Sequence, residues 1–352
     1  MLGSVGLWIY KLEITMLRTY NNAFLLAAAF VSAIITTQTH AAQRTFVSAA
    51  IGNDANAATG CSVTAPCRFF QAAVAATDVS GEVVVLDSGG YGAVVITQSV
   101  ALIAPTGVYA GISVFNGANG IVIATPGVNV VLRGLNINGQ GGGNGIRMVA
   151  GNKLTVQNCV VSNMGASGIS VTGLAAVRVV DTIIRDNGSF GILLEDGALG
   201  TITRAVVSGS TSAGVVARGQ LAGTTTSADI ADSIMSGNLS GVVATSSNAT
   251  ANVNVSIRDS SAVGNSNFGL AAEGSGGNSV RLTASNNIVS NNKVGISALS
   301  AGTTVVAAGN TVSDSSVAGL QNIAGVFRSA GDNSLRHNAT DTSGTISVFP
   351  GR

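Results

Sequence analysis

The sequence predicts an all-β fold, a single-stranded parallel β-helix of the solenoid type, and two observations carry this prediction. The first is a repeat: between residues 129 and 325, a glycine followed by an aliphatic residue recurs at intervals of 23, 23, 23, 27, 28, 26 and 24 residues. A period of this size is typical of solenoids, in which each repeat buries its apolar face against its neighbours. The glycines of these pairs, called the anchor glycines below, are Gly145, Gly168, Gly191, Gly214, Gly241, Gly269, Gly295 and Gly319.

The second observation is the alternation of apolar positions inside each repeat. After Gly191, Ile192 and Leu194 share one face, and Leu193 and Glu195 share the other. A period of two residues indicates strands, whereas helical repeats need an apolar stripe with a period of 3.6 residues, which is not present. We therefore expect coils of about three short strands that stack at about 4.8 Å.

The composition supports a stacked sheet over an ordinary globular domain. The chain of 352 residues has 46 glycines, and charged residues make up 9% of it, against about a quarter in average globular domains. The formal net charge is +1, and no basic stretch is interleaved with aromatic residues. These features argue against nucleic acid as a partner.

The first 42 residues are predicted to be a signal peptide region. Arg18 precedes an apolar run over residues 23–35, and small residues precede Gln43, which is the plan of a cleavable secretory signal. An uncleaved anchor is the alternative, although the run is short for a membrane span. Met16 is a conventional start for this signal, so residues 1–15 are either an over-extended reading frame or part of the chain. We expect a secreted protein, in the periplasm or the medium, with no membrane span in the mature chain.

Three cysteines bear on the chemistry of the mature chain. In an oxidising compartment Cys61 and Cys67 are expected to form a disulfide, and two free thiols are the alternative. The absence of a second cysteine pair and the distance of His337 along the chain argue against a zinc site. Cys159 is expected to be a small buried hydrophobe. We therefore predict no metal and no cofactor.

The chain is expected to have a cap, a body and a closing segment. Residues 43–80 form the N-terminal cap, with a short helix over 66–76 whose Pro66 lies in the first turn. A cap is needed because an open β-helix end exposes unpaired strands. Residues 81–325 form the coils, of which the first lack a clean anchor glycine. Residues 326–352 form the last coil and a closing segment.

Four segments of the chain carry a resemblance to a known family. They are Arg44–Ser48 with Gly52–Asn56, Pro66–Phe70, Leu86–Gly92 and Gly331–Ser334. With them, nearly all of the mature chain resembles secreted bacterial proteins of the right-handed parallel β-helix, or pectin-lyase-like, superfamily, in a subgroup of unassigned activity. The resemblance implies a right-handed coil. The superfamily includes pectate lyases, polygalacturonases, epimerases and phage tailspikes, so the fold by itself implies a carbohydrate ligand only by analogy.

The catalytic constellations of that superfamily are missing from the sequence. Hydrolases of the polygalacturonase type use a paired Asp-Asp and a His-Gly, and alginate epimerases use Asp-Pro-His, none of which occurs here. The best remaining cluster is Arg185 and Asp186 with Glu195 and Asp196 in one coil. Two of its carboxylates could act as acid and base if they lie about 5–9 Å apart. The alternative is structural, because Arg218 falls in register with Glu195 and Asp186 lies in a turn.

Three functions follow from these observations. The leading hypothesis is a secreted, non-catalytic scaffold that binds polysaccharide or another surface component, with Arg147 and Arg218 as candidate binding residues for an anionic glycan. Solvated surface is the alternative for these two arginines. The rival functions are a polysaccharide lyase or glycoside hydrolase with an atypical acidic site, and a purely structural or adhesive protein.

A row of apolar residues is predicted on the outer face of the repeat. Leu193, Val216, Val243 and Ala271 occupy the second position after their anchors in consecutive coils. A contiguous exposed apolar patch usually marks an interface. We expect the C-terminal segment or a second subunit to cover this row, which would make a homo-oligomer. A simply aliphatic sheet face is the alternative.

Overall fold

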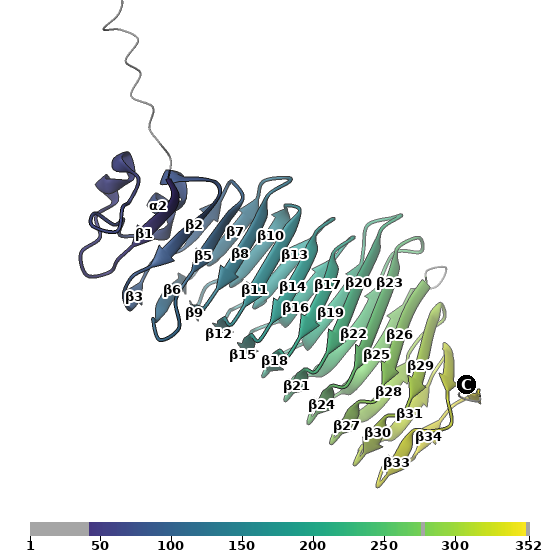
Figure 1. Cartoon of the computed structure of the whole chain (residues 1–352). Coiled ribbons are helices and arrows are strands. Elements are labelled where there is room, and N and C mark those ends of the chain that lie inside the picture. Colours follow the sequence, from purple (N-terminus) through teal and green to yellow (C-terminus); the bar gives the residue numbers. More distant parts are fainter. Residues whose placement is uncertain (1–41, 276–278, 350–352) are drawn as a thin grey trace, which may run out of the picture. The chain divides into compact units, whose positions relative to one another are not determined.

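The fold is a parallel β-helix, as the sequence predicted. The computed structural model of the protein describes residues 42–275 and 279–349. In this part of the chain the strands form three sheets whose neighbouring strands run in parallel, coil after coil (Figure 1). Of the signal peptide region predicted for residues 1–42, residues 1–41 lie outside the described residues.

Each coil passes through the three sheets in the same order, here named I, II and III. Sheet I consists of β1 (Ala42–Val47), β2 (Thr77–Val85), β5 (Val100–Ile103), β8 (Asn129–Arg133), β11 (Lys153–Gln157), β14 (Ala176–Val180), β17 (Leu199–Thr203), β20 (Thr225–Ala231), β23 (Asn252–Arg258), β26 (Ser279–Ser285), β29 (Thr303–Ala308), β32 (Val326–Ser329) and β35 (Ile346–Val348). Sheet II consists of β3 (Gly89–Gly90), β6 (Ala110–Phe115), β9 (Leu135–Gln140), β12 (Val160–Ser162), β15 (Ile183–Arg185), β18 (Val206–Ser208), β21 (Ile234–Ser236), β24 (Ser261–Val263), β27 (Ile288–Ser290), β30 (Thr311–Ser313) and β33 (Ser334–Arg336). Sheet III consists of β4 (Val94–Ile96), β7 (Ile121–Ala124), β10 (Ile146–Ala150), β13 (Ile169–Thr172), β16 (Phe190–Glu195), β19 (Ala213–Gly219), β22 (Ser240–Ser246), β25 (Phe268–Gly274), β28 (Val294–Ala298), β31 (Ala318–Asn322) and β34 (Thr342–Ser343).

The anchor glycines set the register of sheet III. The residue after each anchor pairs with its counterpart in the next coil, as Ile146 does with Ile169 and Ile169 with Ile192. These side chains are fully buried and form part of the core inside the coil. The expectation that the first coils lack an anchor is wrong for one coil, because Ile121 pairs with Ile146 and Gly120 is therefore an anchor too.

Close backbone approach explains why the anchors are glycine. The anchors within sheet III do not have positive φ angles, so conformational freedom is not the reason. A Cβ atom on Gly191 would instead lie 2.6 Å from the carbonyl oxygen of Gly214, and one on Gly214 would lie 2.8 Å from that of Gly241. Real Cβ atoms are not found that close to a carbonyl oxygen, so a side chain at an anchor would push two coils apart.

A ladder of buried asparagines lies against these anchors at the corner between sheets II and III. Asn265 Oδ1 accepts from the backbone N–H of Asn238 at 3.1 Å and from its Nδ2 at 3.2 Å. Asn292 Oδ1 in turn accepts from the backbone N–H and Nδ2 of Asn265, at 2.9 and 3.0 Å. A second ladder of Asn287, Asn310 and Asn333 lies at the corner between sheets I and II. Each asparagine thus satisfies buried amide groups of the neighbouring coil.

The N-terminal cap holds a shorter helix than the sequence predicted. Helix α2 spans Phe70–Ala76, whereas the predicted helix began at Pro66. The four residues before Phe70 are not helical, because Cys67 pairs with Val47 of β1 and its N–H donates to the carbonyl of Phe46. No helix in the part of the chain that the structure describes is long and apolar enough to cross a bilayer.

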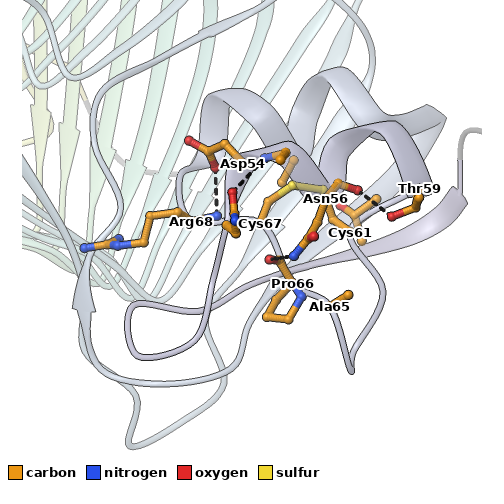
Figure 2. Close-up of a disulfide and its surroundings, with 12 residues drawn as sticks. Asp54, Asn56, Thr59, Cys61, Ala65, Pro66, Cys67 and Arg68 are labelled. Carbon is orange, nitrogen blue, oxygen red and sulfur yellow. Dashed lines mark hydrogen bonds between the residues drawn. A yellow bond between two sulfur atoms is a disulfide. The ribbon is translucent and has the colours of Figure 1, made fainter.

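A disulfide and one carboxylate tie the loop before α2 together. The disulfide joins Cys61 and Cys67 after the 3₁₀ helix η1 (Asp54–Thr59) (Figure 2). Asp54 Oδ1 accepts from the backbone N–H groups of Arg68 and Phe69, at 2.8 and 2.9 Å. These contacts fix the entry of α2, which packs against β1, β2 and β4 at the first end of the coil.

Asp87 fastens β1 to the first coil. Its carboxylate accepts from Ser48 Oγ and from the Tyr91 hydroxyl, both at 2.5 Å, and from the N–H groups of Ala49 and Ala50 at 2.6 and 3.2 Å. Burial acts to raise the pKa of Asp87, but these four hydrogen bonds outweigh burial and lower the pKa to about 2. Burial and the neighbouring Asp87 raise the pKa of Tyr91.

The anchor constraint predicts the effect of Gly214→Ala. The added methyl group would lie 2.8 Å from the Gly241 carbonyl oxygen and 3.0 Å from Asn238 Nδ2. We expect a loss of roughly 1–3 kcal/mol in the free energy of unfolding, as for overpacked cores, measured as a lower melting temperature. Gly90→Ala is the matched control, because a Cβ at Gly90 meets no atom within 4 Å. Equal melting temperatures for the two variants would contradict the close-approach explanation.

The cap predicts a pH dependence that Asp87→Asn should remove. Because the folded-state pKa of Asp87 is about 2 and its ordinary value is 3.8, its contribution is present above the ordinary value and is lost as the pH falls through the folded one. In thermal scans between about pH 5 and pH 2, the wild-type protein should lose more stability than Asp87→Asn does, after starting from a higher melting temperature at neutral pH. Parallel pH profiles for the two proteins would show that Asp87 does not have this role.

Candidate functional site

A groove lies on the outer face of sheet III over the coils of β16 to β28. Its volume is about 210 Å³, and its floor is made of small or aliphatic side chains, among them Val216, Val243 and Ala271. We call it the sheet III groove. The edge near sheet II carries Phe190 and Phe268, and the edge near sheet I carries Arg218, Thr245 and Glu273.

The groove arises from the residue before each anchor glycine. In four consecutive coils this position is occupied by Phe190, Ala213, Ser240 and Phe268, which follow one another in the strand register. Two large rings therefore stand at the ends of a row whose middle members are small. With coils spaced by about 4.8 Å, the two phenylalanine backbones are about 14 Å apart, and the hollow lies between them.

Arg218 crosses the outer face of the sheet and closes one end of the groove. Its Nε donates to Glu195 Oε1 at 2.6 Å, and its guanidinium carbon lies 5.6 Å from the centroid of the Phe190 ring. The guanidinium is thus held by a charge-assisted hydrogen bond and by a cation–π contact. Beneath it, Leu193 and Val216 are 6% and 3% exposed.

This arrangement corrects one part of the prediction of what covers the apolar row, namely the C-terminal segment, while cover by a second subunit stays a prediction. Leu193, Val216 and Ala271 are buried and Val243 is partly buried, but the C-terminal segment does not lie over them. That segment extends the coil instead, because β34 pairs with β31 and β35 pairs with β32. Over Leu193 and Val216 the cover comes from sheet III itself, because Phe190 packs against them and Arg218 reaches from the opposite edge towards the Phe190 ring.

The acidic cluster predicted as a weak catalytic candidate is not brought together. Asp186 lies in the turn before β16 and its carboxylate is paired with Arg185 at 2.7 Å, whereas Glu195 is the last residue of β16. A strand of six residues is about 17 Å long at 3.3–3.4 Å per residue, well beyond the 5–9 Å of paired catalytic carboxylates. Asp196 accepts from the backbone N–H groups of Gln220 and Leu221 at 2.7 and 2.8 Å, so it holds a turn.

The two arginines predicted as binding residues lie on the same face, but only one lines the groove. Arg218 is part of its wall, and Arg147 is exposed on β10, opposite Ser170 of the next coil and outside the groove. Sequence reasoning missed Phe190, Phe268 and Glu273. The large, small, small, large succession before the anchors could have indicated the first two.

The described residues hold no group of three His, Cys, Asp or Glu side chains that could bind a metal ion. The free thiol of Cys159 is buried, and burial raises its pKa to about 11. A thiol in this state is a poor nucleophile at neutral pH. The groove is therefore a site of shape, aromatic rings and a few charges.

Comparisons with known proteins bear on the fold. The family model described as right handed beta helix region matches residues 78–229 and 119–282, and these overlapping matches span more than half of the chain. The chain is similar to the crystal structure of pectate lyase Pel9A, with 15% identity, a TM-score of 0.62, and coverage of 86% of this chain and 78% of that one. It is also similar to the periplasmic alginate epimerase AlgG, with 13% identity, a TM-score of 0.53, and coverage of 77% of each chain. No curated protein sequence matches this chain.

The burial of the apolar row predicts that Val216→Lys destabilises the protein. The new ammonium group would lie in a site that is 3% exposed, next to the Arg218 guanidinium. We expect a loss of roughly 2–4 kcal/mol, because an unpaired charge is buried beside a like charge. Val149→Lys on the same sheet is the control, because Val149 is 41% exposed. If both variants melt at the wild-type temperature, the row is ordinary surface.

Proposed function

The chain belongs to the right-handed β-helix family, and from this premise we propose that it is an exported, non-catalytic protein that binds a polysaccharide chain in the sheet III groove. The proposal has a general and a specific part. The general part is a polysaccharide ligand, and its support is that this chain has the same fold as a pectate lyase and an alginate epimerase. The specific part is the groove and its residues.

The observation that carries the proposal is the hollow between two phenylalanine rings above an apolar floor. The C–H faces of a sugar ring are apolar, so they pack against aromatic and aliphatic side chains, while the hydroxyl groups need polar partners at the rims. Phe190 and Phe268 offer the rings, and Val243, which is partly buried, offers apolar surface on the floor between them. A concave, mostly apolar site with a few polar groups is the usual form of a ligand site.

The charges on sheet III balance, so a polysaccharide in the groove would be held mainly by its fit to the groove. Sheet III carries two cations and two anions in its described strands, Arg147 and Arg218 against Glu195 and Glu273. Glu195 is occupied by Arg218 and by Thr172 Oγ1 at 3.4 Å. Glu273 has no partner among the described residues, so its carboxylate is available to accept from sugar hydroxyl groups.

A catalytic function is the rival, and the placement of the carboxylates argues against it. Glu195 and Glu273 occupy the same position in coils three steps apart, so their backbones are about 14 Å apart. Paired carboxylates in glycosidases lie closer than that. We therefore expect no turnover of polygalacturonate or alginate. Turnover that is abolished by Glu273→Gln would favour the rival function.

Export from the cytoplasm is proposed separately from the ligand and the groove. It is supported by the predicted signal peptide and by the disulfide between Cys61 and Cys67, because disulfides persist in oxidising compartments. The protein expressed with its own N-terminus should be recovered outside the cytoplasm, beginning near Gln43. An uncleaved chain in the cytoplasm would contradict the proposed export, and it would leave the proposal for the groove unaffected.

Phe268→Ala is expected to weaken glycan binding. Removal of one ring from the end of the hollow should lower the affinity for a bound oligosaccharide about tenfold, which corresponds to roughly 1.4 kcal/mol. The ligand is first chosen by screening the wild-type protein on a glycan array, and the affinity is then measured by titration calorimetry.

Phe115→Ala is the matched control for this substitution. Phe115 is 64% exposed at the end of β6 in sheet II, so its loss removes an aromatic ring from a different face. Equal affinities for the two variants and the wild type would place the glycan elsewhere. If no glycan on the array binds, a purely structural or adhesive role replaces the proposal.

A further inference from the structure

The outer face of sheet I carries a concentration of positive charge. Its strands from β8 to β32 hold six exposed cationic side chains and one acidic side chain, Asp229. Among the described residues, one of these cations has an acidic partner, at 4.0 Å in the pair Arg258–Asp229. The six cations, called the cationic face below, are Arg133, Lys153, Arg178, Arg258, Arg281 and Arg328.

The register shows how the sheet tolerates these charges. Arg133, Lys153 and Arg178 lie in three consecutive coils, but each occupies a different position along its strand. Lys153 pairs with Asn129 and Ala176, and Arg133 pairs with Gln157. Like charges directly opposite one another would be destabilising. The cations are therefore staggered across a flat surface, which spreads the positive charge.

Acidic groups at the corners do not neutralise the first half of the cationic face. Asp181, at the corner after β14, is bound by Arg204 through two hydrogen bonds of 2.6 and 2.9 Å. Asp196, at the corner before β17, accepts from two backbone N–H groups and is the one acid beside this half of the face that has no cationic partner among the described residues. Asp232 and Asp259 lie at the corners after β20 and β23, next to the second half of the face. The free positive charge is thus greatest around Arg133, Lys153 and Arg178.

A shallow hollow continues this face toward the C-terminus. It has a volume of about 290 Å³ and lies over β17, β20, β23 and β26. Thr201, Asn254 and Thr283 line it with hydroxyl and amide groups, and Arg281 supplies a cation. Asp229 lines it as well, so an anion in the hollow meets one repulsive group.

We propose that the cationic face is a second binding surface, separate from the sheet III groove, for an extended polysaccharide that carries carboxylate groups. Hydroxyl and amide side chains between the cations suit a ligand that has both carboxylates and hydroxyl groups. Between β8 and β32 the outward positions of sheet I hold no aromatic side chain, and single-stranded nucleic acids need such rings for base stacking. The cationic face and the sheet III groove lie on different sheets, so binding at one does not depend on binding at the other.

The test compares one polymer with and without its charge. Polygalacturonate and its fully methyl-esterified form are titrated against the wild-type protein at several salt concentrations. We expect the charged polymer to bind more tightly and its affinity to fall as salt rises, because salt screens exposed charges. Substitution of three cations by threonine, which keeps strand propensity, should weaken this binding at least tenfold at low salt. The three substitutions are Arg133→Thr, Lys153→Thr and Arg178→Thr.

A matched control removes the same charge from elsewhere. The combined variant Arg185→Thr, Lys293→Thr and Arg336→Thr takes three exposed cations from sheet II and its corner. It should keep the wild-type affinity within about a factor of two or three, because its charges lie outside the face and are screened. An equal loss in both triple variants would show that net charge alone attracts the polymer and would overturn the proposal.

A gain of binding separates the proposal from a folding defect. Asp229→Asn removes the one acid on the face and should raise the affinity for polygalacturonate severalfold, an effect that misfolding does not produce. The groove proposal fails if Phe268→Ala binds its glycan as tightly as the wild type does, and the present proposal fails if the triple variant of the cationic face keeps the wild-type affinity, so the two failures can be told apart. Two results would overturn the assignment. One is an affinity of Asp229→Asn for polygalacturonate equal to that of the wild type. The other is binding of double-stranded DNA as tight as that of polygalacturonate at the same concentration of charged groups.

Discussion

The close stacking of backbones at the corner between sheets II and III is the constraint on which the rest of this structure depends. At each anchor, the carbonyl oxygen of the next coil occupies the space that a Cβ atom would need, as Gly241 does for Gly214. The asparagine ladder fills the remaining room, with Asn238 Nδ2 3.0 Å from the same Cβ position. An asparagine of the next coil lies against the anchor in this way at Gly168, Gly214, Gly241, Gly269 and Gly319, whereas Met164 and Ser210 take its place at Gly145 and Gly191.

Once the corner is fixed, the neighbouring positions are free to carry function. The residue before each anchor contributes little to the core, so it varies in size from coil to coil, and the sheet III groove results where Ala213 and Ser240 lie between Phe190 and Phe268. The outer face of sheet I varies in charge in the same way. Both features arise because outward side chains differ from coil to coil, whereas the side chains of the interior and the corners repeat.

Three acidic side chains have their oxygens occupied by contacts within the fold. Glu195 is held by Arg218, Asp87 accepts four hydrogen bonds in the cap, and Asp196 holds a turn. A carboxylate whose oxygens are already used by the fold is poorly placed to exchange protons with a substrate. The pectate lyase and the alginate epimerase, at 15% and 13% identity, share the fold with this chain, and a shared fold does not by itself specify a function.

What the sequence by itself determined is the coil, because the coil is built from local and repeated features. The alternation of Ile192 with Leu193 assigned inner and outer faces, and the anchor spacing assigned the register, without knowledge of any distant contact. The anchor at Gly120 was missed because it precedes the regular part of the repeat. The start of the cap helix was misplaced because a disulfide and a pairing with β1 hold Cys67 extended. Both are contacts with other segments, and local helix propensity does not reveal them.

The tertiary structure alone decided which outward side chains are covered. Leu193 and Val216 were correctly placed on the outer face, but their burial depends on Arg218, which reaches across from the next coil to the ring of Phe190. Spacing along the chain specifies where a Cα atom lies. It does not specify where a long side chain comes to rest, because that depends on which partners in other coils offer it a charge or a ring.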